Sequence, residues 1–321
     1  MTVSAVDIQS FGKRLSENLE KVIVGKAQAL ELMTIGLLAQ GHILIEDIPG
    51  VGKTMLARAL AKSLGCQFSR LQFTPDMLPT DVTGVSIYNQ STGAFEFRPG
   101  PIMSQVILVD EINRATPKTQ SALLEAMEER QVTVDGITHL LSNPFLVIAT
   151  QNPIEYEGTF PLPEAQLDRF MLRFQIGYPA LLDEMKVLDL QQIQHPIQNL
   201  EAVISLDDLL QVQEAVKQIY VSPAVKRYIV EINRATRSHG DVYLGVSPRG
   251  SLALYKTAQV KAALDGRDYV LPDDIQYMAE YALPHRIVLN PSARLRNLSN
   301  LQVVQEVLTN IPVLDAEFKP R

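Results

Sequence analysis

The segment 46–54, Glu-Asp-Ile-Pro-Gly-Val-Gly-Lys-Thr, constrains the fold of this chain more than any other stretch. A short apolar run, residues 43–45, precedes it, and a run of good helix formers, residues 55–64, follows it. Strand, glycine-rich turn, Gly-Lys-Thr and helix form the context that a phosphate-binding loop requires. The segment therefore predicts an α/β domain built around a phosphate site.

The loop residues carry the groups that a nucleoside triphosphate needs. Gly50 and Gly52 let the backbone turn its N–H groups inward as an anion-binding nest, and the helix start adds partial positive charge. Lys53 is expected to reach the β- and γ-phosphates, and the Thr54 hydroxyl to ligate Mg²⁺. Asp47 stands where the G-x-x-x-x-G-K-[ST] pattern has its first glycine, so we expect an acid near the phosphates.

An apolar turn, Val-Ile-Val-Gly-Lys at 22–26, separates two amphipathic helical patterns ahead of the loop. This turn could wall an adenine ring, or it could be a packed turn between helices, and the sequence favours neither. The residues expected to bind the nucleotide are Val24, Gly50, Val51, Gly52, Lys53, Thr54 and Met55.

Two further apolar runs end in polar residues suited to hydrolysis. Residues 106–109 lead into Asp110 and Glu111, and residues 145–149 lead into Thr-Gln-Asn-Pro, which contains Asn152. The carboxyl ends of parallel strands share the edge of the sheet at which ligands bind. We expect Asp110 to hold Mg²⁺ through water, Glu111 to orient or deprotonate the attacking water, and Asn152 to bond the γ-phosphate and that water.

Two β-hairpins are predicted, at about 84–100 and about 131–142, around Ser-Thr-Gly and Asp-Gly turns. Tyr88, Phe95 and Phe97 of the first hairpin could contact a polypeptide. The competing and favoured interpretation for the two phenylalanines is that they pack the hairpin onto the core. His139 is expected to be a surface strand residue, because no second His or Cys lies near it in sequence.

The chain beyond residue 181 shows no clear strand pattern. Ser222 and Ser247 each precede a proline, which is typical of a capped helix start. We predict a nucleotide-binding core over 1–178, with strands also at 67–73 and 172–176, and an all-α lid with a C-terminal tail over 179–321. One last helix is expected after Pro291. Arg249 would be the second residue of a lid helix, able to project beyond its end.

The composition limits the binding partners and the cellular compartment that the protein can have. The chain has 321 residues, a net charge of −7, and a single cysteine, Cys66. The negative charge argues against broad phosphate-backbone binding, and one cysteine excludes disulfides within the chain. No apolar run is long enough for a membrane span. These features predict a soluble, cytoplasmic protein.

The motifs, taken in order, resemble those of the MoxR family of AAA+ ATPases, in the group with a hairpin inserted in helix 2. Their order and spacing match from about residue 22 to residue 287. The motifs are Ile-Pro-Gly-Val-Gly-Lys-Thr (48–54), Val-Asp-Glu-Ile-Asn-Arg-Ala (109–115), Ala-Thr-Gln-Asn-Pro (149–153), Leu-Pro-Glu-Ala-Gln-Leu-Asp-Arg-Phe (162–170), Ser-Pro-Arg (247–249), Pro-Asp-Asp (272–274) and His-Arg-Ile (285–287).

The resemblance implies a five-stranded αβα domain with a helical lid, assembled into a ring that is usually a hexamer. It implies ATP and Mg²⁺ as cofactors, Asn152 as sensor 1, Arg169 as the arginine finger and Arg249 as the sensor 2 arginine. It also implies chaperone-like remodelling or activation of partner proteins, which often carry a von Willebrand factor A domain.

Two other functions are weighed. A nucleic-acid translocase would carry basic hairpin tips, whereas residues 89–93 and 135–136 contain no Lys or Arg. A nucleotide-gated scaffold with little turnover would lack Glu111, Asn152 or Arg169, and all three are present.

Overall fold

A five-stranded parallel β-sheet forms the centre of the protein, as predicted. The computed structural model describes residues 3–153, 158–192 and 195–313. The sheet has the order β2-β5-β8-β1-β9, and every neighbouring pair is parallel. Its strands are β1 (His42–Glu46), β2 (Phe68–Gln72), β5 (Val106–Asp110), β8 (Leu146–Gln151) and β9 (Phe170–Phe174).

Successive side chains along the apolar strands point alternately into two separate hydrophobic clusters, one on each face of the sheet. Ile43 and Ile45 join one cluster, while Leu44 between them joins the other. The first face is covered by α2 (Ala27–Leu38) and α3 (Lys53–Ser63), and α1 (Ala5–Glu20) packs on these two helices. The opposite face is covered by α4 (Pro79–Thr83) and α5 (Pro117–Glu129). Continuous apolar strands are therefore needed, because both faces are buried.

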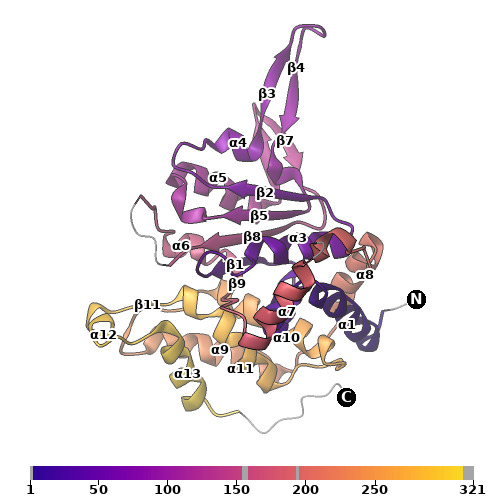
Figure 1. Cartoon of the computed structure of the whole chain (residues 1–321). Coiled ribbons are helices and arrows are strands. Elements are labelled where there is room, and N and C mark those ends of the chain that lie inside the picture. The colour runs from indigo at the N-terminus through magenta and orange to yellow at the C-terminus, as the bar shows by residue number, and fades with distance from the viewer. Residues whose placement is uncertain (1–2, 154–157, 193–194, 314–321) are drawn as a thin grey trace.

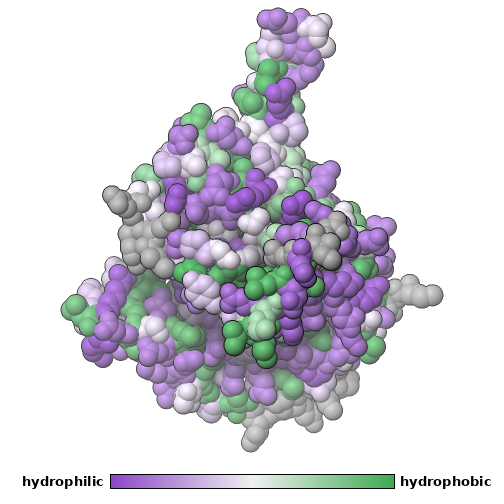
Figure 2. Space-filling model, in the orientation of Figure 1, coloured by the Kyte–Doolittle hydropathy of each residue, from purple (hydrophilic) through white to green (hydrophobic). Residues whose placement is uncertain are grey.

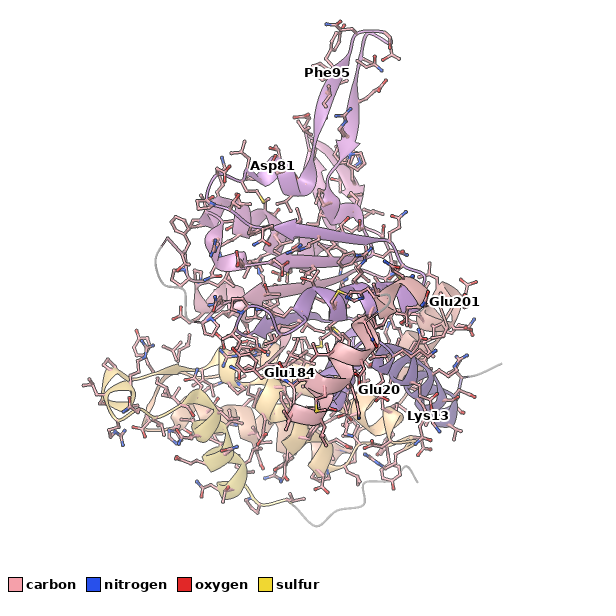
Figure 3. The ribbon with its side chains drawn as sticks, viewed as in Figure 1. Lys13, Glu20, Asp81, Phe95, Glu184 and Glu201 are labelled. Carbon is pink, nitrogen blue, oxygen red and sulfur yellow. The ribbon has the colours of Figure 1, made fainter. Side chains whose placement is uncertain are left out.

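Both predicted hairpins are present, and the first projects well away from the body of the molecule (Figure 1). The first consists of β3 (Gly84–Asn89) and β4 (Ala94–Pro99), and the second of β6 (Gln131–Val134) and β7 (Ile137–Leu140). Phe95 is 73% exposed near the hairpin end (Figure 3), so the prediction that it packs on the core is wrong. Phe97 stacks on His139 with ring centroids 3.8 Å apart, joining the hairpins to each other. His139 is consequently half-buried.

The C-terminal region is helical, with two departures from the prediction. β10 (Val242–Leu244) and β11 (Val288–Leu289) form a small antiparallel sheet that is too short to leave a sequence pattern. The expected last helix is two helices, α12 (Pro291–Leu295) and α13 (Asn300–Asn310), because Ser299 caps a new start with its side chain. The remaining helices are α6 (Glu164–Leu167), α7 (Leu181–Gln191), α8 (Leu206–Val216), α9 (Pro223–Ser238), α10 (Pro248–Leu264) and α11 (Pro272–Ala282), with 3₁₀ turns at Pro101–Met103, Ile112–Arg114, Pro196–Asn199 and Pro284–Arg286.

The core and the lid share one hydrophobic cluster, which runs from the first face of the sheet into α9, α10 and α11. An ion-pair cluster reinforces this contact at Glu31 of α2. Its carboxylate accepts hydrogen bonds from Lys261 Nζ and from the Tyr277 hydroxyl, both at 2.8 Å. The lid is therefore packed firmly on the α2 side of the core.

Among the helices of the described residues, none has the length and apolar content to cross a membrane. Cys66 is partly buried, and burial raises the pKa of its thiol to about 11. The thiol therefore remains protonated at neutral pH, as a packing residue does.

Candidate functional site

The predicted phosphate loop, the carboxylates and Asn152 line one cavity of about 340 Å³ at the carboxyl edge of the sheet. The backbone takes left-handed angles at Gly50 (φ 88°) and Gly52 (φ 89°), which only glycine adopts without strain. The lining residues are Pro49, Gly50, Gly52, Lys53, Thr54, Met55, Arg70, Gln72, Asp110, Glu111, Thr150 and Asn152. Of the predicted loop set, Val51 packs against the hydrophobic cluster instead, and Val24 lines a different cavity.

Asp47 lies outside this cavity, so the expectation of an acid near the phosphates is wrong. Its Oδ2 accepts hydrogen bonds from the backbone N–H groups of Ile176 and Gly177, both at 2.7 Å, and Oδ1 accepts from the N–H of Ile48. The side chain is nearly fully buried, and it ties the loop to the chain leaving β9. The backbone carbonyl of Asp47, by contrast, accepts a hydrogen bond from Lys53 Nζ at 2.6 Å.

We expect Asp47→Ala to lower the free energy of unfolding by about 2–4 kcal/mol, because it leaves the backbone N–H groups of Ile48, Ile176 and Gly177 without their carboxylate acceptor. Urea unfolding of the nucleotide-free protein measures the change. Asp47→Asn keeps one carbonyl oxygen and should lose less. Equal stability of Asp47→Ala and the wild type would contradict this account of the loop.

The carboxylate of Asp110 accepts hydrogen bonds from two neighbouring side chains. Oδ2 accepts a hydrogen bond from Arg70 Nε at 2.7 Å, and Oδ1 accepts one from the Thr150 hydroxyl at 3.2 Å. Thr54 and Asp110 line the same cavity, so a hydroxyl and a carboxylate oxygen are available to Mg²⁺. Among the described residues no group of three or more His, Cys, Asp or Glu side chains gathers to hold a metal. A small number of protein ligands is enough for Mg²⁺, because this ion takes its other oxygen ligands from water and phosphates.

Glu111 is held in a conformation that few residues adopt. Its φ is 56°, in the left-handed region, and its backbone N–H donates to the Thr150 hydroxyl at 2.9 Å. Its Oε2 accepts from Gln72 Nε2 at 2.6 Å and pairs with Arg114 Nε at 3.1 Å. Backbone strain of this kind costs about 1–3 kcal/mol and concentrates at functional sites. Gln72 and Arg114 thus hold the carboxylate, and Thr150 holds the backbone, where Glu111 lines the cavity.

Sequence reasoning missed Arg70, Gln72 and Thr150. Arg70 and Gln72 alternate along β2, a pattern that places them on one face of a strand. They reach the carboxylates only because β2 pairs with β5, with Gln72 opposite Asp110. The sequence pattern does not indicate which strands are neighbours, so no local signal placed Arg70 and Gln72 in the site.

Arg169 and Arg249 meet in a second cavity, of about 390 Å³, which has none of its lining residues in common with the first. Arg169 Nε lies 3.1 Å from Glu128 Oε2, and Arg249 contacts the other oxygen of the same carboxylate. Arg169 therefore pairs with a carboxylate of α5, which is distant from it in sequence. His42 also lines this cavity, and burial lowers its pKa to about 3, so the ring is neutral.

The two cavities lie at opposite edges of the sheet. Arg169 directly precedes β9, whereas Asp110 ends β5 and Asn152 directly follows β8. The strands are parallel, so a residue before a strand and a residue after one are separated by the strand length, about 16 Å for five residues. Neither arginine belongs to the phosphate cavity of its own chain.

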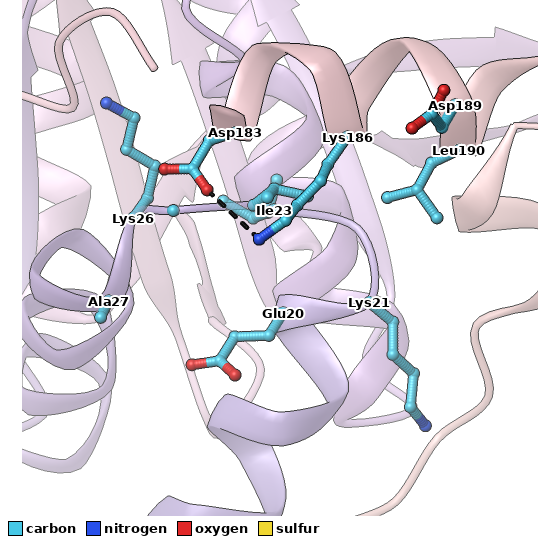
Figure 4. Close-up of a pocket in the computed structure, with 11 residues that line it drawn as sticks. Glu20, Lys21, Ile23, Lys26, Ala27, Asp183, Lys186, Asp189 and Leu190 are labelled. Atoms are coloured by element: carbon cyan, nitrogen blue, oxygen red, sulfur yellow. Dashed lines mark ion pairs between the residues drawn. The ribbon is translucent and has the colours of Figure 1, made fainter. Parts of the chain in front are cut away.

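Val24 lines a third cavity, of about 620 Å³, between the 22–26 turn and α7 (Figure 4). Ile23 and Val24 contribute apolar surface, and Asp183, Lys186 and Asp189 of α7 contribute charge. An ion pair joins Asp183 and Lys186 at 3.8 Å. Glu20, Lys21 and Lys26 also line it beside the turn, so the cavity combines apolar surface with charged groups, as sites for flat heteroaromatic rings do.

Comparison with known proteins identifies this arrangement. Residues 42–172 match the model of the ATPase family associated with various cellular activities (AAA), and residues 234–307 match an AAA lid domain. Chaperone MoxR1 of Mycobacterium tuberculosis is 39% identical over 99% of this chain and 86% of its own length. The uncharacterized protein YeaC of Bacillus subtilis is 57% identical over 96% of both chains. A crystal structure from Cytophaga hutchinsonii superposes with a TM-score of 0.91 at 38% identity, over 97% of both chains.

The fold and the phosphate cavity define an AAA ATPase, an enzyme that binds and hydrolyses ATP. Within that class, the chain belongs to the MoxR family.

Proposed function

We propose that this ATPase works as a ring, and that hydrolysis drives chaperone-like remodelling or activation of partner proteins in the cytoplasm. One observation carries the proposal: Arg169 and Arg249 lie at the edge of the sheet opposite the phosphate cavity of the same chain. A second copy must then supply these charges to the γ-phosphate. Head-to-tail contacts of this kind close into rings, and the family resemblance favours a hexamer.

The polar residues of the phosphate cavity each have a proposed role in ATP hydrolysis. Lys53 and the loop N–H groups bind the phosphates, and Thr54 and Asp110 hold Mg²⁺, which neutralises charge on the phosphate oxygens. Glu111 orients or deprotonates the attacking water, and Asn152 bonds that water and the γ-phosphate. The adenine ring is proposed to occupy the cavity beside Val24.

An apolar helix face supports contact with a second copy. Leu181, Leu182 and Leu188 of α7 are 76%, 70% and 70% exposed, and apolar surface gathers over this helix in Figure 2. Contiguous exposed apolar surface is typical of an interface. We propose that the neighbouring subunit covers α7.

The projecting hairpin supports contact with partner proteins. Tyr88 and Phe95 are 52% and 73% exposed, and their rings meet edge to face at 5.3 Å. We propose that partners, including proteins with a von Willebrand factor A domain, contact this aromatic pair. The hairpin ends at 89–93 and 135–136 contain no Lys or Arg, which argues against nucleic acid as the partner.

Replacing both Tyr88 and Phe95 with Ala should spare basal ATP hydrolysis and reduce ATP-dependent reactivation of urea-unfolded luciferase at least fivefold. The rings are far from the phosphate cavity and lie where an unfolded chain would contact them. Gln90→Ala, an exposed neighbour without a ring, is the matched control and should retain full reactivation. Full reactivation by the double variant would remove the aromatic pair from the proposal.

A further inference from the structure

A single carboxylate bridges the two arginines of the second cavity. Glu128 lies at the end of α5, and its two oxygens are divided between a core arginine and a lid arginine. Oε2 is 3.1 Å from Arg169 Nε, and Oε1 accepts from Arg249 Nη2. The side chains of Glu128, Arg169 and Arg249 are 34%, 28% and 47% exposed, so the bridge is open to solvent and to a neighbouring molecule.

Two further arginines line this cavity, and both donate to partners other than Glu128. Arg130 donates to the backbone carbonyls of Phe145 and Gln40. Arg286 donates from Nε to Asp168 Oδ1 at 2.8 Å and is nearly fully buried. The outward-facing positive charge of the cavity therefore comes from Arg169, Arg249 and the exposed Lys256 of α10, and Glu128 is the carboxylate between the two arginines.

Asp168 links the backbones of the two arginines through a hydrogen bond to the start of α10. Its Oδ2 accepts a hydrogen bond from the hydroxyl of Ser247 at 2.8 Å, and Ser247 is the N-cap of α10. Arg249 is the second residue of that helix, and Arg169 directly follows Asp168 in the chain. The backbones of the two arginines are thus fixed relative to each other, and only their guanidinium groups need to move.

We propose that Glu128 is a resident counter-anion that occupies Arg169 and Arg249 until the triphosphate held by a neighbouring copy displaces it. This inference rests on the proposed function, because it concerns the same arginines acting across a subunit contact. Guanidinium forks bind carboxylate and phosphate with the same geometry, so the two anions compete for the same donors. Glu128 then opposes assembly on ATP, and it raises the protein concentration at which rings form.

The competing role for Glu128 is a purely structural one. If the carboxylate only pre-orients the arginines and stays bound to them in the ring, its removal weakens assembly. If it competes with the triphosphate, its removal strengthens assembly. The sign of the effect therefore separates the two roles.

The test is Glu128→Gln, measured in a Glu111→Gln background so that ATP is not consumed. Sedimentation velocity at saturating ATP and Mg²⁺ gives the protein concentration at which half of the chains are assembled. We expect Glu128→Gln to lower this concentration roughly threefold to thirtyfold, since two partly exposed ion pairs no longer have to be broken. Glu129→Gln is the matched control: it makes the same charge change at the adjacent exposed residue and should leave the midpoint unchanged.

A second comparison ties the effect to the arginines. In a chain that also carries Arg169→Ala and Arg249→Ala, Glu128→Gln should have no effect on the midpoint. An unchanged or raised midpoint in the first comparison, or a shift that persists without the arginines, overturns the inference. If the parent Glu111→Gln protein forms no rings with ATP at any concentration, the proposed ring itself is wrong and this inference falls with it.

Discussion

Glu111→Gln should hydrolyse ATP roughly 10²–10⁴-fold more slowly than the wild type while binding ATP with unchanged affinity. The amide keeps the size of the side chain and its hydrogen bond with Gln72, but it cannot accept a proton from water. The carboxylate lies in the same cavity as Lys53 and Asn152, where the γ-phosphate and the attacking water are expected.

Steady-state phosphate release and titration with a fluorescent ATP analogue measure the two quantities separately. Lys53→Ala should lose binding itself, because it removes the cation of the phosphate loop. Glu125→Gln, an exposed glutamate on α5, is the control for charge and should change neither quantity. Turnover near the wild-type rate in Glu111→Gln would remove Glu111 from the catalytic step.

Arg169→Ala should bind ATP normally and hydrolyse it roughly 10³–10⁵-fold more slowly, the range found for arginines that act on a transferred phosphoryl group. The expectation follows from the position of Arg169, which is one strand length away from the phosphate cavity of its own chain. A planar, permanently charged fork suits the charge that develops on the phosphoryl oxygens. Single-turnover hydrolysis at high protein concentration is the measurement.

Mixing variants tests whether Arg169 acts on a neighbour. Lys53→Ala subunits cannot bind ATP but still carry Arg169, so adding them to Arg169→Ala subunits should restore hydrolysis. The matched control is a subunit with both substitutions, which should restore nothing. If mixed rings form and hydrolysis stays absent with Lys53→Ala subunits, Arg169 does not act across the contact.

Local patterns were sufficient for the elements and for most of the phosphate cavity. The apolar run at 43–45 indicates a strand, because a buried strand accepts only apolar side chains. The glycines at 50 and 52 indicate the turn, because a positive φ favours glycine. Residues at the carboxyl ends of parallel strands meet at one edge of a sheet, so the sequence alone places Asp110 and Asn152 together. Short elements such as β10 and β11 carried too few residues to show a period.

The sequence by itself determined which residues end strands and open helices, and hence the phosphate loop, the carboxylates and Asn152. Only the tertiary structure decided the contacts between distant segments. Because β2 pairs with β5, Arg70 contacts Asp110. The Asp47 carboxylate binds the backbone N–H groups after β9 and not the phosphate cavity. The packing of α10 against the core joined Arg249 to Arg169 through Glu128. A sequence period reports which face of an element is buried, whereas the choice of neighbour depends on how all the faces pack at once.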